Sequence, residues 1–170
     1  MDIFKEQIVR KLPSKNDGVT RFLIILAAVA LAMMCFLFTF GTQFVLFGIL
    51  FAGFVLYGGY YLVTNFDVEY EYILTNGEMD FDKITAQRSR KRLCTVRFGA
   101  AEAFGVADDS ADTANADTYV KATAEDPEQT DYYVRLKHKS LGDTVVYFTP
   151  TEEMLELIKP YLPRNIRSKV

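Results

Sequence analysis

The side chains best suited to covalent chemistry in this 170-residue chain are one cysteine and the single histidine. Cys94 and His138 could form a thiolate and a general base, because each lies in a segment with the pattern of a strand. No third residue that would orient the histidine is indicated, so a core cysteine and an edge histidine are the favoured interpretation. Cys35, the other cysteine, lies inside a long apolar run and is interpreted as a small buried hydrophobe.

Two groups of acidic residues invite a functional interpretation. Glu69, Glu71, Asp80 and Asp82 fall on two adjoining segments in which polar and apolar residues alternate. An acid–base cluster would look like this, but so does the solvent-facing side of an antiparallel hairpin, which is the favoured interpretation.

The second group, the acidic residues Asp109 and Asp112 together with the amide Asn115, resembles a calcium loop in composition only. Such a loop needs ligands at alternate positions and a glycine at its sharp turn, and the segment has neither. The chain also has no glycine-rich phosphate loop, no pair of histidines for a metal and no nucleophile elbow. The sequence therefore predicts a protein that is not an enzyme and carries no metal or cofactor.

Positive charge is concentrated in one short segment, which the pattern predicts to be a compact turn. Arg88, Arg90, Lys91 and Arg92 place four charges within five residues. Beside anionic lipid each could contribute about 1 kcal/mol, so these four are candidate residues for binding lipid headgroups or a protein partner. The alternative is a solvated loop whose charges only help topology or pair with acidic residues. Nucleic-acid binding is not predicted, because no aromatic residues interleave with these charges and the net charge is −3.

The element that must position everything else is the stretch from Phe22 to Val63, which contains no Asp, Glu, Lys or Arg. Gly41, Thr42 and Gln43 divide it into the apolar runs 22–40 and 44–63. Each run is long enough to cross a hydrocarbon core of roughly 30 Å as a helix. The sequence thus predicts a transmembrane helical hairpin over residues 21–64. A cleaved signal peptide is not favoured, because the first run is too long.

Small residues four apart predict where the two helices touch. Ala28 with Ala32, and Gly48 with Ala52, would each form a small-residue face that allows close approach in lipid. The two spans contain no ionisable acid or base of the kind that lines a transport path, so transport by this chain alone is not predicted.

The flanking charges predict the orientation of the hairpin. The N-terminal flank is basic, whereas the turn between the spans is uncharged; the basic residues are Lys5, Arg10, Lys11, Lys15 and Arg21. By the positive-inside rule the N-terminus is cytoplasmic, and two crossings return the chain to the same side. We therefore expect a multi-pass protein of the plasma membrane with both termini in the cytoplasm.

Residues 1–20 have two interpretations. Phe4, Ile8 and Leu12 recur every four residues among basic neighbours, which is the pattern of a short amphipathic helix on the inner membrane surface. The alternative is a basic topology signal with little order, because isolated helices of this length are marginal.

Strand patterns begin after the hairpin, in the region 65–163. Residues 68–75 alternate polar with apolar, Asn76-Gly77 predicts a type I′ turn, and Met79 and Phe81 continue the alternation on a return strand. A third strand is predicted from Leu93 to Phe98. Residues 105–131 are rich in Asp and Glu and poor in large apolar residues, so we expect a mobile acidic loop, with a transient strand around Tyr119 and Val120.

The C-terminal part alternates again and then changes to helical chemistry. Strands are predicted over 132–139 and 144–148. Thr149 is the expected N-cap, Pro150 the first helical position and Glu152 the partner in a capping box. The apolar stripe of the helix is Met154, Leu155, Ile158 and Leu162, and residues 164–170 form a basic tail.

These elements predict an α+β protein, and their order resembles bacterial membrane proteins with a pleckstrin-homology-like (PH-like) domain. Residues 68–96 are similar to a two-span family of that kind, through the tyrosine-rich strand, the Asn76-Gly77 turn, the return strand at 82–84 and the basic segment. The resemblance implies a partly open barrel whose end is capped by the C-terminal helix. It carries over no catalytic residue.

The functional expectation is a membrane-anchored, non-enzymatic interaction module whose cytoplasmic domain contacts anionic lipid or a protein partner. The alternative is an accessory subunit that binds a larger membrane complex through the hairpin. Changes at Gly48 and Ala52 would matter for the second function, and changes at 88–92 for the first.

Overall fold

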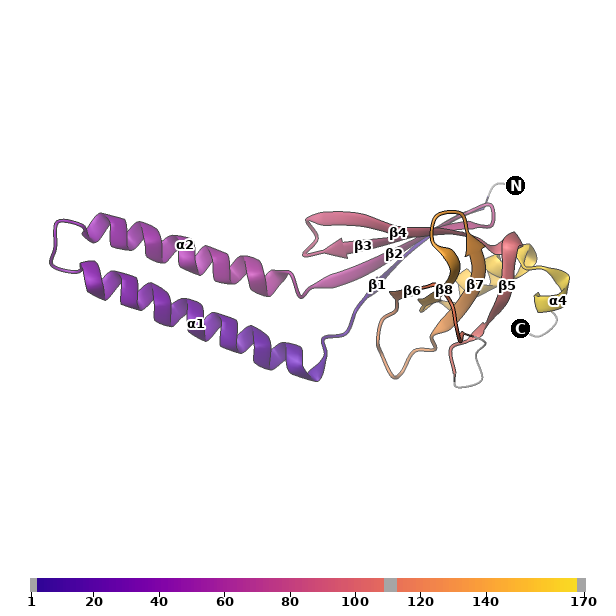
Figure 1. Cartoon of the computed structure of the whole chain (residues 1–170), viewed down its shortest axis with the longest axis horizontal. Coiled ribbons are helices and arrows are strands. Elements are labelled where there is room, and N and C mark those ends of the chain that lie inside the picture. The colour runs from indigo at the N-terminus through magenta and orange to yellow at the C-terminus, as the bar shows by residue number, and fades with distance from the viewer. Residues whose placement is uncertain (1–2, 109–112, 168–170) are drawn as a thin grey trace. The chain divides into compact units, whose positions relative to one another are not determined.

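A computed structural model describes residues 3–108 and 113–167 of the chain. The chain divides into two compact units, one formed by Pro13–Asp67 and the other by Met1–Leu12 together with Val68–Val170. Figure 1 shows the first unit as a pair of long helices and the second as a set of strands with short C-terminal helices.

The helical unit consists of α1 (Lys15–Thr39) and α2 (Val45–Thr64). Both helices are long and apolar enough to cross a membrane, in agreement with the predicted runs 22–40 and 44–63. Helix α1 begins earlier than its apolar run, because Ser14 and Asp17 form a cap in which the Ser14 backbone N–H donates to the Asp17 carboxylate at 2.9 Å. Gly41 has a φ of +79° in the connecting turn.

The first sheet contains a strand from the region before the helices. Its order is β1 (Phe4–Arg10), β2 (Val68–Thr75), β3 (Glu78–Thr85) and β4 (Ser89–Arg97), with every pair antiparallel. The predicted amphipathic helix within residues 1–20 is therefore wrong. Residues four apart share a face of a strand as well as of a helix. The spacing of Phe4 and Ile8 therefore fitted both structures and could not distinguish a strand from a helix.

The β2–β3 turn is as predicted. Asn76 and Gly77 have φ angles of 48° and 84°, as a type I′ turn requires. The Asn76 side chain also accepts a hydrogen bond from the backbone N–H of Ile3 at 2.9 Å, and the Tyr161 ring packs directly against Gly77.

The compact basic turn predicted over 88–92 is wrong. The chain reverses at Ala86 and Gln87, both with a φ of 53°, and residues 89–92 belong to β4. Thr85 pairs with Ser89, so the strand begins four residues earlier than the predicted Leu93. Cross-strand pairing of its arginines with acidic residues of β3 stabilises this register.

The second sheet has the order β5 (Ala101–Val106), β7 (Tyr132–His138), β8 (Gly142–Phe148) and β6 (Thr118–Ala122). Strands β7 and β8 confirm the predicted hairpin. Strand β6 runs parallel to β8, so the segment around Tyr119 is a regular part of a sheet and not a transient strand in a loop. Strand β5 was not predicted.

The C-terminal segment contains α3 (Glu152–Ile158), a 3₁₀ turn η2 (Lys159–Tyr161) and one further helical turn, α4 (Arg164–Arg167). The N-cap is Thr151, whose hydroxyl accepts from the Met154 N–H at 3.3 Å, so the predicted cap at Thr149 and box with Glu152 are wrong. The predicted apolar stripe is buried. The tail is helical through Arg167, with Ile166 buried, and its last three residues lie outside the described residues.

The core lies between the two sheets and is built on aromatic contacts. Tyr72, Phe81 and Phe148 pack mutually, with ring centroids 5.2 to 5.9 Å apart, and Phe98 and Phe104 extend the cluster. Within the described residues the strands form two open four-stranded sheets and not one closed barrel. This arrangement agrees with the predicted α+β class and partly open sheet.

Candidate interaction surfaces

The basic residues of β4 lie beside carboxylates of the neighbouring strands. Register aligns Glu71 of β2 with Asp82 of β3, and Asp82 with Arg92 of β4. The Arg92 guanidinium contacts Asp80 through Nη1 and Asp82 through Nε, each at 2.9 Å. Arg90 reaches across β3 to form an ion pair with Glu71.

Two of these carboxylates are buried, although the alternating pattern predicted a solvent-facing side. Glu71 and Asp82 are only 1% and 3% exposed, because the long arginine side chains lie over them. Burial raises the pKa of Glu71, and a hydrogen bond with Glu6 adds to this, while Arg90 opposes it. The hydrogen bond to Asp82 raises the pKa of Arg92. Arg90 and Arg92 therefore neutralise buried acids.

The other two predicted binding residues are placed differently. Arg88 lies in the turn before β4, and Lys91 pairs in register with Lys83; both are exposed. In the same sheet, Val68 pairs with Thr85, and Thr85 with Ser89. The β3–β4 turn thus lies at the same end of the first sheet as Val68, the first residue of β2.

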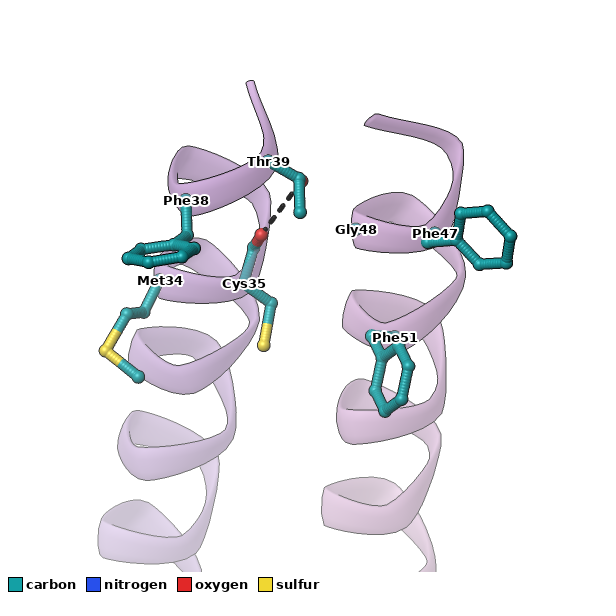
Figure 2. Close-up of a pocket in the computed structure, with 7 residues that line it drawn as sticks. All are labelled: Met34, Cys35, Phe38, Thr39, Phe47, Gly48 and Phe51. Carbon is teal, nitrogen blue, oxygen red and sulfur yellow. Dashed lines mark hydrogen bonds between the residues drawn. The ribbon is translucent and has the colours of Figure 1, made fainter. Parts of the chain in front are cut away.

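In the helical unit, small residues lie where α1 and α2 meet. Figure 2 shows Thr39 and Gly48 facing each other, and a Cβ added at Gly48 would collide with the Thr39 hydroxyl. That hydroxyl donates to the Cys35 carbonyl at 3.0 Å. Ala32 and Gly48 are buried, and Ala28 and Ala52 are half-buried. Gly59, which the spacing argument missed, lies directly against Ala28.

Near the turn the two helices leave an apolar groove of about 500 Å³. Its walls include Met34, Phe38, Phe47 and Phe51 (Figure 2). The groove offers packing surface but no charged group, so it has no chemistry of its own.

Cys94 and His138 do not form a reactive pair. Cys94 is buried in the core, and burial raises the pKa of its thiol to about 12, which keeps it protonated at neutral pH. His138 ends β7 in the other sheet, where its Nδ1 accepts from the Ser140 backbone N–H at 3.3 Å. The described residues contain no group of three or more His, Cys, Asp or Glu that could hold a metal. Asp109 and Asp112 lie outside them.

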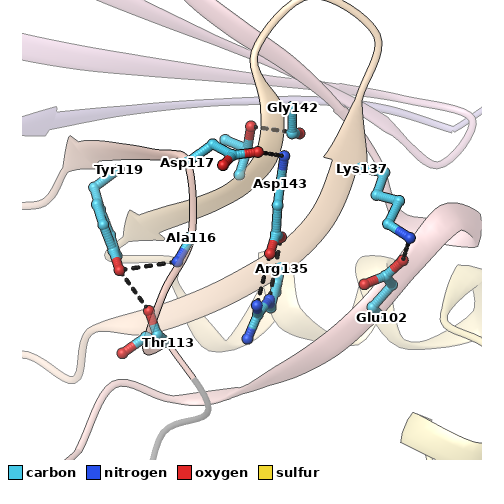
Figure 3. A network of polar contacts seen from close by, with 10 residues as sticks. Glu102, Thr113, Ala116, Asp117, Tyr119, Arg135, Lys137, Gly142 and Asp143 are labelled. Atoms are coloured by element: carbon cyan, nitrogen blue, oxygen red, sulfur yellow. Dashed lines mark hydrogen bonds and ion pairs between the residues drawn. The ribbon is translucent and has the colours of Figure 1, made fainter.

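A polar network organises the β7–β8 turn (Figure 3). Arg135 donates two hydrogen bonds to the Asp143 carboxylate, at 3.1 Å from Nε and 2.6 Å from Nη2. These bonds lower the pKa of Asp143. Asp117 accepts from the Asp143 N–H through its side chain at 2.9 Å and donates its own N–H to the Asp143 carbonyl at 2.8 Å. Composition had assigned Asp117 to a solvated loop, and no local pattern marks this structural role.

Comparison with known proteins identifies one family. The family model described as “Bacterial PH-like domain (DUF6106)” matches residues 1–168. The match includes the strand before the helices as well as both sheets after them. No curated protein and no solved structure matches the chain.

Proposed function

The chain belongs to the bacterial PH-like domain family, and on this premise we propose that it is a membrane-anchored, non-enzymatic interaction module whose domain contacts anionic lipid. The membership confirms the resemblance carried by residues 68–96. PH-like domains are generally non-catalytic, and the buried, protonated Cys94 gives no reason to assign this chain a reaction.

The observation that carries the proposal is the pairing of β1 with β2. One strand precedes the apolar helices and the other follows them, yet they pair over seven residues, from Phe4 with Thr75 to Arg10 with Glu69. Strands of one sheet occupy one compartment, so two crossings between them satisfy both the sheet and the apolar helices. The basic N-terminal flank then favours the cytoplasmic face of the plasma membrane for both termini.

Chain length supports contact between the domain and the bilayer surface. Only three residues separate Thr64, the last residue of α2, from Val68, the first residue of β2. Fully extended, this connection spans at most about 14 Å, whatever the arrangement of the two units. The end of the sheet that carries the β3–β4 turn is therefore tethered close to the headgroups.

At this end we assign lipid contact to Arg88 and Lys91. Each could contribute about 1 kcal/mol beside anionic lipid. Both side chains are exposed at this end of the sheet. Of the basic residues before the helices, Arg10 pairs with Glu69 at 3.2 Å and Lys11 with Glu125 at 3.0 Å. Arg90 and Arg92 hold buried carboxylates, so their role is to stabilise the sheet that presents the turn.

The test uses the full chain in lipid nanodiscs with an environment-sensitive fluorophore at Gln87→Cys, after Cys35 and Cys94 are replaced by Ala. Nanodiscs containing phosphatidylglycerol should shift the emission to the blue relative to purely zwitterionic ones, and high salt should reverse the shift. The double variant Arg88→Gln, Lys91→Gln should abolish the difference. The double variant Lys137→Gln, Lys139→Gln removes the same charge elsewhere and should retain it. Equal spectra in both lipids would reject the lipid contact.

Binding of a larger membrane complex through the hairpin has less support. Gly48 and Gly59 would be natural docking points for another helix, but both already face α1. Gly48 and Gly59 thus serve the internal packing of this hairpin.

A further inference from the structure

A second basic surface lies at the opposite end of the first sheet. It is a groove of about 270 Å³ between β3 and β4 on one side and β7 with its following turn on the other. The residues that give it chemical character are Glu78, Arg97, Leu136, Lys137, His138 and Lys139. Glu78 follows the Asn76-Gly77 turn and pairs with Arg97, so this end of the sheet is remote from Val68 and the tether.

The cations of the groove are weakly engaged inside the molecule. Arg97 pairs with Glu78 at 2.5 Å, but both side chains are exposed. Lys137 lies 3.8 Å from Glu102, and its side chain is mostly exposed. Lys139 has no ion pair within the described part of the chain. Exposed ion pairs contribute little to stability, so carboxylates of a ligand can replace them at little cost.

The His138 ring lines the same groove. Its Nδ1 accepts from the Ser140 backbone N–H at 3.3 Å and lies 3.2 Å from the Ser140 hydroxyl oxygen, so contacts within the turn after β7 orient the ring.

The hairpin that carries Lys137 and Lys139 is fixed before any ligand arrives. The Asp117 carboxylate accepts from the Asp143 N–H (Figure 3), and the Asp117 N–H donates to the Asp143 carbonyl. The Thr118 hydroxyl donates to the Leu141 carbonyl at 2.9 Å. Arg135 donates two hydrogen bonds to the carboxylate of Asp143. A hairpin backbone that is already ordered loses less conformational freedom on binding than a mobile loop carrying the same lysines would.

The geometry points to a docking site for an acidic, extended segment of a soluble protein. The charges of the groove favour carboxylates, and its position away from the tether makes it accessible from the aqueous phase. The β3–β4 turn would contact lipid while the groove holds a partner, so one domain would recruit an acidic protein to the membrane surface. This inference goes beyond the proposed lipid contact and does not depend on it.

The experiment titrates the full chain, in purely zwitterionic nanodiscs, against fluorescein-labelled hexaglutamate and follows the anisotropy. Saturable binding is expected, and the double variant Lys137→Gln, Lys139→Gln should weaken it about tenfold, which is the loss of two exposed ion pairs. The matched control Arg88→Gln, Lys91→Gln removes the same charge at the tethered end and should bind within about twofold of the parent. All four side chains are exposed, and a circular dichroism spectrum checks that each variant is folded.

Three results would overturn the inference. The first is that hexaglutamate does not bind saturably. The second is that both double variants weaken hexaglutamate binding equally. The third is that inorganic phosphate, at a concentration equal to that of the peptide's carboxylates, displaces hexaglutamate, which would indicate a small-anion site. Because the nanodiscs carry no anionic lipid, none of these results bears on the lipid contact, and failure of one proposal is distinguishable from failure of the other.

Discussion

At the scale of single residues, Thr149 connects more of the domain than any sequence pattern suggested. Its hydroxyl donates to Asp131 at 2.5 Å and accepts from the Ala124 N–H at 2.9 Å, while its own N–H donates to the Tyr72 hydroxyl at 3.1 Å. The Gln7 side chain donates to its carbonyl at 2.9 Å. This buried residue thereby links both sheets. The sequence suggested a helix cap here, because a threonine before a proline satisfies that local pattern equally well.

Replacing Thr149 by Val should therefore destabilise the domain by about 1–3 kcal/mol, because the shape is kept while the buried partners lose their hydrogen bonds. Denaturant unfolding of the detergent-solubilised chain, followed by near-ultraviolet circular dichroism, measures the change. Thr130→Val, at an exposed loop position, is the control and should shift the unfolding free energy by less than about 0.5 kcal/mol. Equal midpoints for the two variants would contradict the structural role of Thr149.

The Arg135–Asp143 pair predicts a pH dependence. Because the pKa of Asp143 is lowered in the folded state, its contribution is present above the unfolded value of about 3.9 and is lost as the pH falls through the folded value. Asp143→Asn should thus be less stable than the parent at pH 7, and the difference should narrow below about pH 4. Unfolding free energies measured across this range check it.

The pH dependence of stability has the opposite sign for Asp131, because burial raises the pKa of this carboxyl. Its favourable contribution is present below the unfolded value and is lost as the pH rises through the folded one. Asp131→Asn keeps an oxygen that can accept from Thr149 and should gain stability relative to the parent as the pH rises from about 4 to 7. A common sign for the two variants would show that the assigned causes are wrong.

At the scale of elements, local chemistry predicted the hairpins, and non-local pairing decided the rest. A type I′ turn needs a positive φ at both central residues, and Asn and Gly adopt it readily, so the dipeptide Asn76-Gly77 alone predicted the turn. Strand β1 could not be predicted in this way, because its partner β2 follows the whole helical hairpin and no local pattern reveals that pairing. Strand β6 was predicted only as a transient strand, because its acidic, alanine-rich segment becomes a regular strand only beside β8.

Two neighbouring substitutions in β1 distinguish the observed strand from the alternative of a helix on the membrane surface, because the two structures predict opposite rankings of their effect on stability. Val9 is 6% exposed and faces the core, whereas Ile8 is 58% exposed. Val9→Asp should destabilise the domain by more than about 2 kcal/mol, since it buries a carboxylate, and Ile8→Asp should cost less than about 1 kcal/mol. The same unfolding assay compares them. A helix lying on the membrane would instead depend on Ile8 and tolerate Val9→Asp.

At the scale of the whole molecule, an apolar hairpin is inserted between two strands that pair with each other. The spans and the α+β class followed from composition and periodicity, which are properties of contiguous segments. The family resemblance followed from the order of the elements and from the residues of 68–96. The candidate site followed only in part. Counting charges identified Arg88 to Arg92, but the separation of Arg90 and Arg92, which hold buried acids, from Lys91 depends on register with β2 and β3.

The central claim is that the chain crosses the membrane twice and returns to complete its own N-terminal sheet. Cysteine accessibility in intact cells tests it most directly, with Thr42→Cys in the turn between the helices and Gln87→Cys in the β3–β4 turn, each introduced after Cys35 and Cys94 are replaced by Ala. A membrane-impermeant maleimide should label Thr42→Cys in intact cells and Gln87→Cys only after the cells are opened. Labelling of Gln87→Cys in intact cells, or of Thr42→Cys only in opened cells, would contradict the claim.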